Sequence, residues 1–500
     1  MTGTEELGRG GRLAGAAADE LVAAAFAAES AHGPRLARGL SIADLAHAVA
    51  LVEGGDLGGE DAKALLRGLL ELHDIPGDAF PWNPSLGDAF NSREAELERR
   101  VGRSAAGWLS AGRPRREALR VALRLTARSG VRKLHDALID QAAALARHAR
   151  TTRDALAADY TYLQPAQPTT LGHLLLAYAY PALRDADRAR ASHAELGTSV
   201  AGAGGSAGSR WALDRVRLAE LLGCDALVEH AKDAAWQWDV YLVLLSTLAV
   251  AATHQSQLGQ DFEIYASQEF GLIELADAHS RASALMPQKK NPYALAAIRV
   301  QAGQAAGDVA GALVTLHTGS ARTDHFHLLN GTVPRALEEA AAIARLTASV
   351  LDGMELRTER FAQVARDGLV TAADVADVLA LSGELDYRSA HKVVGLAVRE
   401  LVEAGEPPQE LTPPRLAAAA EATIGRPVEL DEAVLRDALD PAACAAARRQ
   451  VGSSSAAAMD AMLEEIEATL AEHGRWSSTV TTRAAAAEEA LLVRARELAR

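Results

Sequence analysis

The sequence predicts an all-α protein whose elongated protomer has three domains and a central bundle of long helices. Hydrophobic residues make up 49% of the 500 residues, aromatic residues only 4%, and alanine is abundant throughout. Alanine has the best helix propensity, whereas β-rich cores favour branched and aromatic side chains. One core rarely organises a chain of this length, so two or three domains are expected. No β-alternation of convincing length is visible.

The first predicted domain covers residues 1–112. Its short helical patterns are interrupted by glycine- and proline-rich segments, which are typical of turns and loops. These segments are "HGP" at 32–34, "EGGDLGGED" at 53–61 and "IPGDAFPWNPSLGD" at 75–88. The sequence therefore predicts an N-terminal helical domain with long connections.

The second predicted domain, residues 113–363, contains the long helices. Apolar residues recur at close to seven-residue spacing in two stretches, namely Val131, Leu134, Leu138 and Leu145, and Leu295, Ile298, Ala302, Ala305, Val309 and Leu316. This spacing places an apolar stripe on one side of a helix. Stripes that continue over many turns favour helices packed at shallow angles, so we predict a bundle that also forms the core of an oligomer.

The third predicted domain, residues 364–500, has shorter helical patterns and a proline-rich break, "GEPPQELTPP" at 405–414. Its tail, 481–500, is a charged, alanine-rich helical pattern. We expect that tail to be a helix that is solvated or contacts another subunit.

Composition also limits the partners and the location. The formal net charge is −15 and no long basic run occurs, so no nucleic-acid partner is expected. Two cysteines, Cys224 and Cys444, form neither a disulfide scaffold nor a metal cluster and suit a reducing compartment. The first residues lack the apolar stretch of a signal peptide, and the longest apolar run, 240–252, is shorter than the roughly 20 residues of a membrane span. A cytoplasmic protein without a membrane partner is expected.

The common cofactor and metal signatures are missing from the sequence. It has no dinucleotide-binding glycine motif after a strand, no phosphate-binding loop, no HExxH and no GxSxG. The 15 histidines lack the spacing of metal ligands. We therefore expect no cofactor and no metal, so that side chains and backbone carry any chemistry.

Three polar segments border the long apolar helices, where loops on a rigid scaffold often hold a site. They are "SAGRPRREA" at 110–118, "DYTYLQPAQPTTLGH" at 159–173 and "AHSRASALMPQKKNP" at 278–292. In the third, Ser283 lies in a run of small residues, which favours a mobile loop. Lys289 and Asn291 supply a point charge and an amide, both suited to holding a carboxylate. A bare pair of lysines usually indicates only a solvated surface, but the string "SALMPQKKNP" is far more specific.

These residues resemble the signature loop of the fumarase/aspartase superfamily, roughly G-S-S-x-M-P-x-K-x-N-P, and within it argininosuccinate lyase. "DYTYLQPAQPTTLGH" is similar to that branch's Y-T-H-L-Q-x-A-Q-P segment, and "AGRPRRE" to its T-G-R-S-R-N-D. "QDFEIYASQEFGLIELADAHS" and "VTAADVADVLALSGELDYRSAHKVV" also resemble that branch. The resemblance extends over about residues 10 to 465 and implies a fumarase/aspartase-like fold.

The resemblance implies a C–N lyase that releases fumarate from an N-substituted aspartate or succinyl-type substrate by β-elimination. A base removes a proton next to a carboxylate, the resulting dianion is stabilised by positive charge, and an acid protonates the leaving group. Ser283 matches the serine base, and the predicted substrate-carboxylate ligands are Arg115, Thr161, Lys289 and Asn291. Backbone N–H groups and Lys289 are expected to help Ser283 ionise once the loop closes.

Further residues complete the predicted site. Tyr162 stands where the family has a histidine and is either the general acid or a packing residue. Together with Ser283 and Thr161 it completes the predicted catalytic set. Gln164, Arg116 and Ser30 are the further predicted substrate contacts. Arg116 either binds an anionic substituent of the leaving group or faces solvent. His325 and His327 are further candidates for facing that group.

Several departures from the family pattern concentrate at the leaving-group end. The family's histidine is Tyr162 and its partner glutamate is Ala296, so both halves of one hydrogen-bonded pair are absent together. Another family histidine is Phe90, and the family's S-R-N is Pro114-Arg115-Arg116. The segment 319–330, "GSARTDHFHLLN", replaces the family's P-S-T-Y-N-K-D-L-Q. These changes favour a substrate other than argininosuccinate.

Two alternatives remain open at this point. The superfamily includes a cycloisomerase branch, which stabilises the same carboxylate without releasing fumarate. It also includes non-catalytic, crystallin-like structural homologues. The resemblance further implies a homotetramer whose active sites combine segments of three subunits, which would bring Arg115, Thr161 and Ser283 together only in the assembly.

Overall fold

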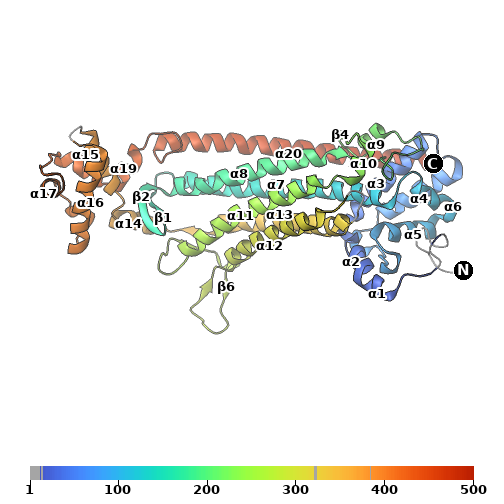
Figure 1. Ribbon diagram of the computed structural model, residues 1–500, viewed down its shortest axis with the longest axis horizontal. Coiled ribbons are helices and arrows are strands. Elements are labelled where there is room, and N and C mark those ends of the chain that lie inside the picture. The colour runs from blue at the N-terminus through green and yellow to red at the C-terminus, as the bar shows by residue number, and fades with distance from the viewer. Residues whose placement is uncertain (1–11, 13–14, 320–323, 383–384) are drawn as a thin grey trace.

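The structure is a computed structural model that describes residues 12, 15–319, 324–382 and 385–500. The described residues form an elongated bundle of long helices with a smaller helical cluster at each end (Figure 1). Its strands are short and occur only in two-stranded pairs. The predicted all-α fold class is confirmed, whereas the predicted domain boundaries remain predictions.

The central bundle consists of α7 (Arg115–Thr151), α8 (Leu171–Leu196), α11 (Asp239–Tyr265), α12 (Tyr293–Leu316) and α13 (Asp324–Gly353). α7 packs along α8 and α13, and α11 packs along α12. On α7, all four residues of the predicted stripe are buried. On α12, Leu295, Ile298, Ala305 and Leu316 are buried as well. The seven-residue spacing therefore predicted the faces that these helices bury.

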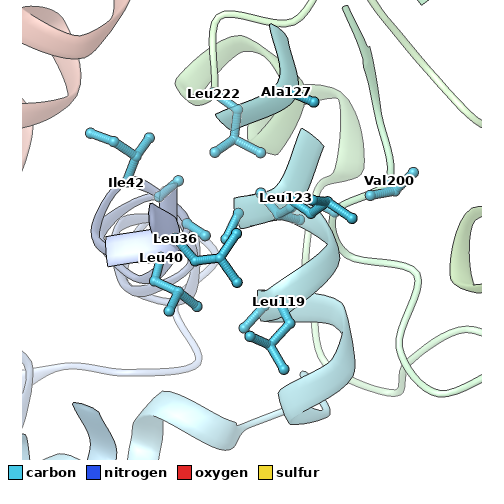
Figure 2. Packing of buried hydrophobic residues seen from close by; sticks show 14 of the residues in the cluster. Leu36, Leu40, Ile42, Leu119, Leu123, Ala127, Val200 and Leu222 are labelled. Carbon is cyan, nitrogen blue, oxygen red and sulfur yellow. The ribbon is translucent and has the colours of Figure 1, made fainter. Parts of the chain in front are cut away.

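The N-terminal cluster packs onto the first turns of α7. Its elements are α1 (Asp19–Leu21), η1 (Val22–Phe26), α2 (Ala27–Ser30), α3 (Gly33–Glu53), α4 (Gly59–His73), η2 (Gly77–Ala79), η3 (Pro84–Leu86), α5 (Ala89–Val101), α6 (Arg103–Ala106) and η4 (Gly107–Ser110). Leu36 and Leu40 of α3 meet Leu119 and Leu123 of α7 in one apolar cluster (Figure 2). Gly39 permits this close approach, because a Cβ there would lie 2.5 Å from the carbonyl oxygen of Ala122.

Shorter elements connect the long helices and form the cluster at the opposite end. Between α8 and α11 lie β3 (Thr198–Ser199), α9 (Arg215–Leu221), β4 (Ala226–Leu227) and α10 (Ala231–Trp236). Between α11 and α12 lie β5 (Ile273–Glu274), η5 (Asp277–His279), β6 (Arg281–Ala282) and β7 (Lys290–Asn291). The distal cluster follows β8 (Glu355–Leu356) and comprises α14 (Thr358–Asp367), α15 (Ala372–Leu381), α16 (Tyr387–Ala404), η6 (Pro408–Glu410), α17 (Pro413–Ile424), α18 (Glu432–Leu439) and α19 (Pro441–Ala447).

The last helix, α20 (Ala456–Leu498), runs back along the bundle from the distal cluster to the N-terminal cluster (Figure 1). It packs on α7 and α8 and ends against α3 and α4. Leu491, Leu492 and Ala495 are buried in the same apolar cluster as Leu36 of α3. The expectation of a merely solvated or subunit-contacting tail is therefore corrected, because this helix completes the core of its own chain.

A β-hairpin is the main element that the sequence did not predict. β1 (Leu156–Thr161) pairs antiparallel with β2 (Gln164–Thr170), next to the distal end of α7. Pro165 and Pro168 obscured the strand pattern, since proline donates no ladder hydrogen bond and is tolerated only at sheet edges. A two-stranded sheet consists only of edges, so both prolines fit. Every helix in the described part of the chain is too short or too polar to cross a membrane.

A buried histidine where α20 meets α8 makes the stability of the fold depend on pH. His193 is 7% exposed and lies edge-on to Trp476, with ring centroids 5.2 Å apart. Burial, assisted by the nearby Arg128, lowers the pKa of His193 from 6.5 to about 4. Between these values the unfolded chain binds a proton that the folded chain does not, so stability is complete above pH 6.5 and falls as the pH drops.

We expect His193→Leu to flatten this acid dependence. Between neutral pH and about pH 4, the free energy of unfolding of wild type should fall by up to roughly 3 kcal/mol more than that of the variant. Urea unfolding of both proteins at several pH values measures the difference. Equal losses in the two proteins would contradict the expectation.

Candidate active site

The segment 278–292 forms a loop that projects from the side of the bundle (Figure 1). Its stem is the antiparallel pair of β6 and β7, and the side-chain amide of Asn291 donates a 2.9 Å hydrogen bond to the carbonyl oxygen of Arg281. α12 begins at Tyr293, directly after the stem. Residues 284–289 are exposed. The loop is thus anchored at its base and open at its tip.

Within this loop, the Ser283 hydroxyl oxygen accepts two backbone hydrogen bonds. The N–H of Met286 lies 3.0 Å away and that of Leu285 lies 3.4 Å away. Two donors directed at one oxygen favour negative charge on it. These are the kind of backbone donors expected for a serine base, and the role of Ser283 as a base stays a prediction.

The two adjacent lysines have different surroundings. Lys290 extends its ammonium to Asp277 at 2.8 Å and to Glu274 at 3.0 Å, and the hydrogen bond that it donates to Asp277 is the largest cause of its raised pKa. Lys290 is exposed, and these ion pairs lie at the surface. Lys289 is exposed, and its ammonium makes no hydrogen bond or ion pair with any residue that the structure describes. Lys289 is thus the lysine available for a ligand.

The hairpin tip carries Thr161, Tyr162 and Gln164. Thr161 pairs with Gln164, and the two residues between them have positive φ angles, 53° for Tyr162 and 58° for Leu163. Such values match a two-residue turn of type I′, which normally selects Asn-Gly. Bulky residues in this conformation are strained and often mark functional sites. Tyr162 is 99% exposed, so its side chain is not packed against any described residue.

A pocket of about 360 Å³ lies beside this tip, lined by Tyr162 and by Tyr178 and Asp261 of α8 and α11. The Tyr178 hydroxyl donates a 2.6 Å hydrogen bond to Asp261. Burial, followed by the charges of Tyr265 and Asp261, raises the pKa of Tyr178. Tyr178 therefore keeps its proton, and Tyr162 is the phenol of this pocket that lies fully in solvent.

The start of α7 holds Arg115 and Arg116. The Arg115 guanidinium lies 3.6 Å from the Asp88 carboxylate, which itself caps the N-terminus of α5. Ser30, at the end of α2, is 3% exposed, and its hydroxyl makes no hydrogen bond with any described residue. The charge of its neighbour Glu29 acts to raise the pKa of Arg116, against the larger lowering by burial. Ser30, Arg115 and Arg116 thus belong to one end of the molecule.

The family-histidine position Phe90 and the two histidine candidates of α13 lie in this region too. Phe90 is fully buried, with the guanidinium of Arg113 5.5 Å from its ring. His325 is buried between Phe326 and Trp236, whereas His327 forms a 2.9 Å ion pair with Glu29. The segment 319–330 that carries these histidines includes 320–323, which lie outside the described residues.

Sequence reasoning missed a cationic pocket at the start of α7. Its volume is about 340 Å³, and its lining includes Arg115 and Arg116 together with Arg120 of α7 and Lys232 of α10. The signal for Arg120 was its spacing of four residues from Arg116, which puts both on one helical face. Lys232 had no local signal, because only the tertiary fold brings α10 beside α7.

The predicted site residues lie in three separate places of one chain. Arg115 begins α7, and the hairpin follows its other end. At about 1.5 Å per residue the helix spans roughly 54 Å, and a strand of this length returns at most about 20 Å, so Arg115 and Thr161 stay more than about 30 Å apart. The loop with Ser283, Lys289 and Asn291 projects elsewhere (Figure 1).

Comparisons with known protein families identify two regions. Residues 15–307 match the family described as lyase, and residues 369–446 match the argininosuccinate lyase C-terminal family. The chain is 32% identical to the argininosuccinate lyase of Methanoculleus marisnigri over 498 residues, covering 98% of this chain and 99% of the relative. It is 35% identical to that of Thermus thermophilus, covering 73% of this chain and 80% of the relative.

Solved structures agree with these matches. EDDS lyase in complex with formate superposes with a TM-score of 0.85 at 27% identity, covering 97% of this chain and 96% of that one. A variant of EDDS lyase with bound fumarate gives the same values. A class II fumarase from Schistosoma mansoni, at 14% identity and a TM-score of 0.68 over 82% of this chain and 90% of its own, shares the fold.

Proposed function

The chain belongs to the argininosuccinate lyase family, and from this premise we propose which residues act and on what kind of substrate. It is a carbon–nitrogen lyase that releases fumarate. We propose an N-substituted aspartate or succinyl-type substrate other than argininosuccinate. The observation that carries this proposal is the contrast between a complete loop around Ser283 and a changed leaving-group end.

At the succinyl end, Ser283 removes the proton from the carbon next to a carboxylate. Its hydroxyl oxygen accepts the N–H groups of Met286 and Leu285, which stabilise the serine anion. Lys289 and Asn291 hold the carboxylate as it gains its second negative charge. The exposed ammonium of Lys289 supports this role, because a dianion needs a cation that no protein carboxylate already neutralises.

At the nitrogen, Tyr162 donates the proton as the C–N bond breaks, with Thr161 and Gln164 holding the substrate beside it. Its full exposure and strained backbone support this role over packing within its own chain. Arg115 and Ser30 complete the substrate contacts from the other end of the molecule. Arg116 faces the leaving group.

We propose that these groups meet in a homotetramer. Several observations support an assembly along α11 and α12. Val243 and Val250 of α11, and Val300, Leu313 and Val314 of α12, are exposed in the single chain. Gly303, Gly307 and Gly311 repeat at four-residue spacing on α12, with open space where each Cβ would lie. A helix with such a face can approach a partner helix closely.

A mixing experiment tests the shared sites. We expect Ser283→Ala and Arg115→Met each to be nearly inactive alone, but mixed subunits, refolded together, should regain about a quarter of the wild-type activity. Each kind of residue is intact in half of the subunits, so both are intact in about a quarter of sites built from different chains. Refolding each variant by itself is the control. If both residues came from one chain, the mixture would stay inactive.

The reaction itself is tested with fumarate and a panel of amines, following fumarate absorbance in the ultraviolet. Consumption of fumarate with an amine, and its release from the isolated product, are the expected results. Absence of turnover with every succinyl compound in both directions would favour the cycloisomerase or crystallin-like alternatives. The cytoplasmic location expected from the sequence remains a prediction.

A further inference from the structure

The cationic pocket at the start of α7 contains a buried guanidinium that forms no ion pair with any described residue. Arg120 is only 7% exposed, and its side chain makes no hydrogen bond with any residue in the described ranges. Its guanidinium carbon lies 3.8 Å from the centre of the Phe326 ring, and its Nε is buried and unsatisfied. Burial lowers the pKa of Arg120 to about 10. Burying a charge in this way is unfavourable unless a counter-ion completes the site.

No other lining residue in the described chain forms an ion pair with Arg120, although the charge of Glu117 acts to raise the pKa of Arg120. Glu117 is the pocket's one acidic lining residue within the described chain, and its two carboxylate oxygens accept the N–H groups of Gly202 and Gly204, at 2.7 and 2.8 Å. Arg116 has no described partner, and burial followed by the charge of Arg115 lowers its pKa. Lys232 is exposed and also unpaired among the described residues. Positive charge is thus in excess here, although the whole chain carries a net charge of −15.

We propose that this pocket binds an anionic substituent of the leaving amine, either a carboxylate or a phosphoryl group. The inference rests on the proposed function, because Arg115 lines this pocket and is also a predicted contact of the substrate. Arg120 forms the fixed floor of the subsite with a planar fork of donors, and Lys232 closes it from α10. The same charges disfavour a leaving amine that would place a cationic group in this pocket.

Equilibrium binding tests the subsite without turnover. With fumarate saturating the succinyl end, inorganic phosphate and malonate are titrated separately by calorimetry into wild type and variants. We expect wild type to bind at least one of them, and Arg120→Met and Lys232→Met each to weaken that binding by about tenfold or more. The anion that binds more tightly identifies the class. Lys133→Met is the matched control, since Lys133 is another exposed lysine and lies on α7 in a different cleft.

Arg120→Met replaces a buried charge, so this variant can fail to fold. Lys232→Met changes an exposed residue at the rim of the pocket and keeps the test valid in that case. Wild type that binds neither anion, or variants that bind as wild type does, would overturn the proposal. Turnover of fumarate with two amines that differ only in one carboxylate gives an independent readout. A lower KM for the anionic amine, lost in Lys232→Met, supports the subsite. Equal KM values with active enzyme would reject the subsite while leaving the lyase function intact.

Discussion

Replacing Ser283 by alanine should lower kcat by roughly a thousandfold, the usual contribution of a general base. The hydroxyl oxygen is the point at which two backbone N–H groups converge, and no other side chain of the loop offers an equivalent oxygen there. Initial rates of fumarate release measure the loss. KM should change little, because the proposed carboxylate ligands Lys289 and Asn291 remain in place.

Ser280→Ala is a suitable control. Ser280 lies three residues earlier, and its hydroxyl donates to the carbonyl oxygen of Ala276 instead of accepting from the loop. We expect near-normal rates from it. Both variants should keep the wild-type oligomeric state in light scattering. Substantial activity in Ser283→Ala would assign the base to another residue.

Replacing Lys289 by methionine should lower kcat about a hundredfold or more, whereas the same change at Lys290 should have a much smaller effect. Lys289 is proposed to stabilise a charge that appears only in the transition state, and loss of one such electrostatic contact typically costs that much. Lys290 instead pairs with Glu274 and Asp277 at the surface, where ion pairs contribute little.

The two lysines are neighbours of identical chemistry, so each variant controls for the other. Steady-state kinetics of both variants, with thermal melts to confirm folding, distinguish a substrate contact from a loop anchor. If Lys290→Met had the lower kcat of the two variants, the loop stem and not the ammonium of Lys289 would determine the rate.

Much of the fold followed from the sequence because helical packing leaves a local signal. The spacing of Leu295, Ile298 and Ala305 shows which face of α12 is buried before any partner is known. The loop residues were found in the same way, because Ser283, Lys289 and Asn291 lie within nine positions of one another. Their chemistry is contained in one short string.

The remainder depended on contacts between distant segments. Arg120 was not predicted because its burial is produced by Phe326 of α13, far along the chain. The strained turn at Tyr162 was not predicted because Tyr-Leu lacks the usual residues of such a turn, and only the pairing of β1 with β2 imposes it. The course of α20 was equally invisible, since its sequence suits a solvated helix until α3 and α4 are placed beside it.

The course of α20 has a consequence for biosynthesis. A ribosome releases the N-terminal residues first, yet Leu491, Leu492 and Ala495 belong to the same apolar cluster as Leu36. The helix α3 therefore carries an open apolar surface until residues 491–495 have been translated. A cut before Leu491 would damage the N-terminal cluster instead of the distal cluster. These two distant segments mature as one unit, and their shared core is complete only after α20 has been synthesised.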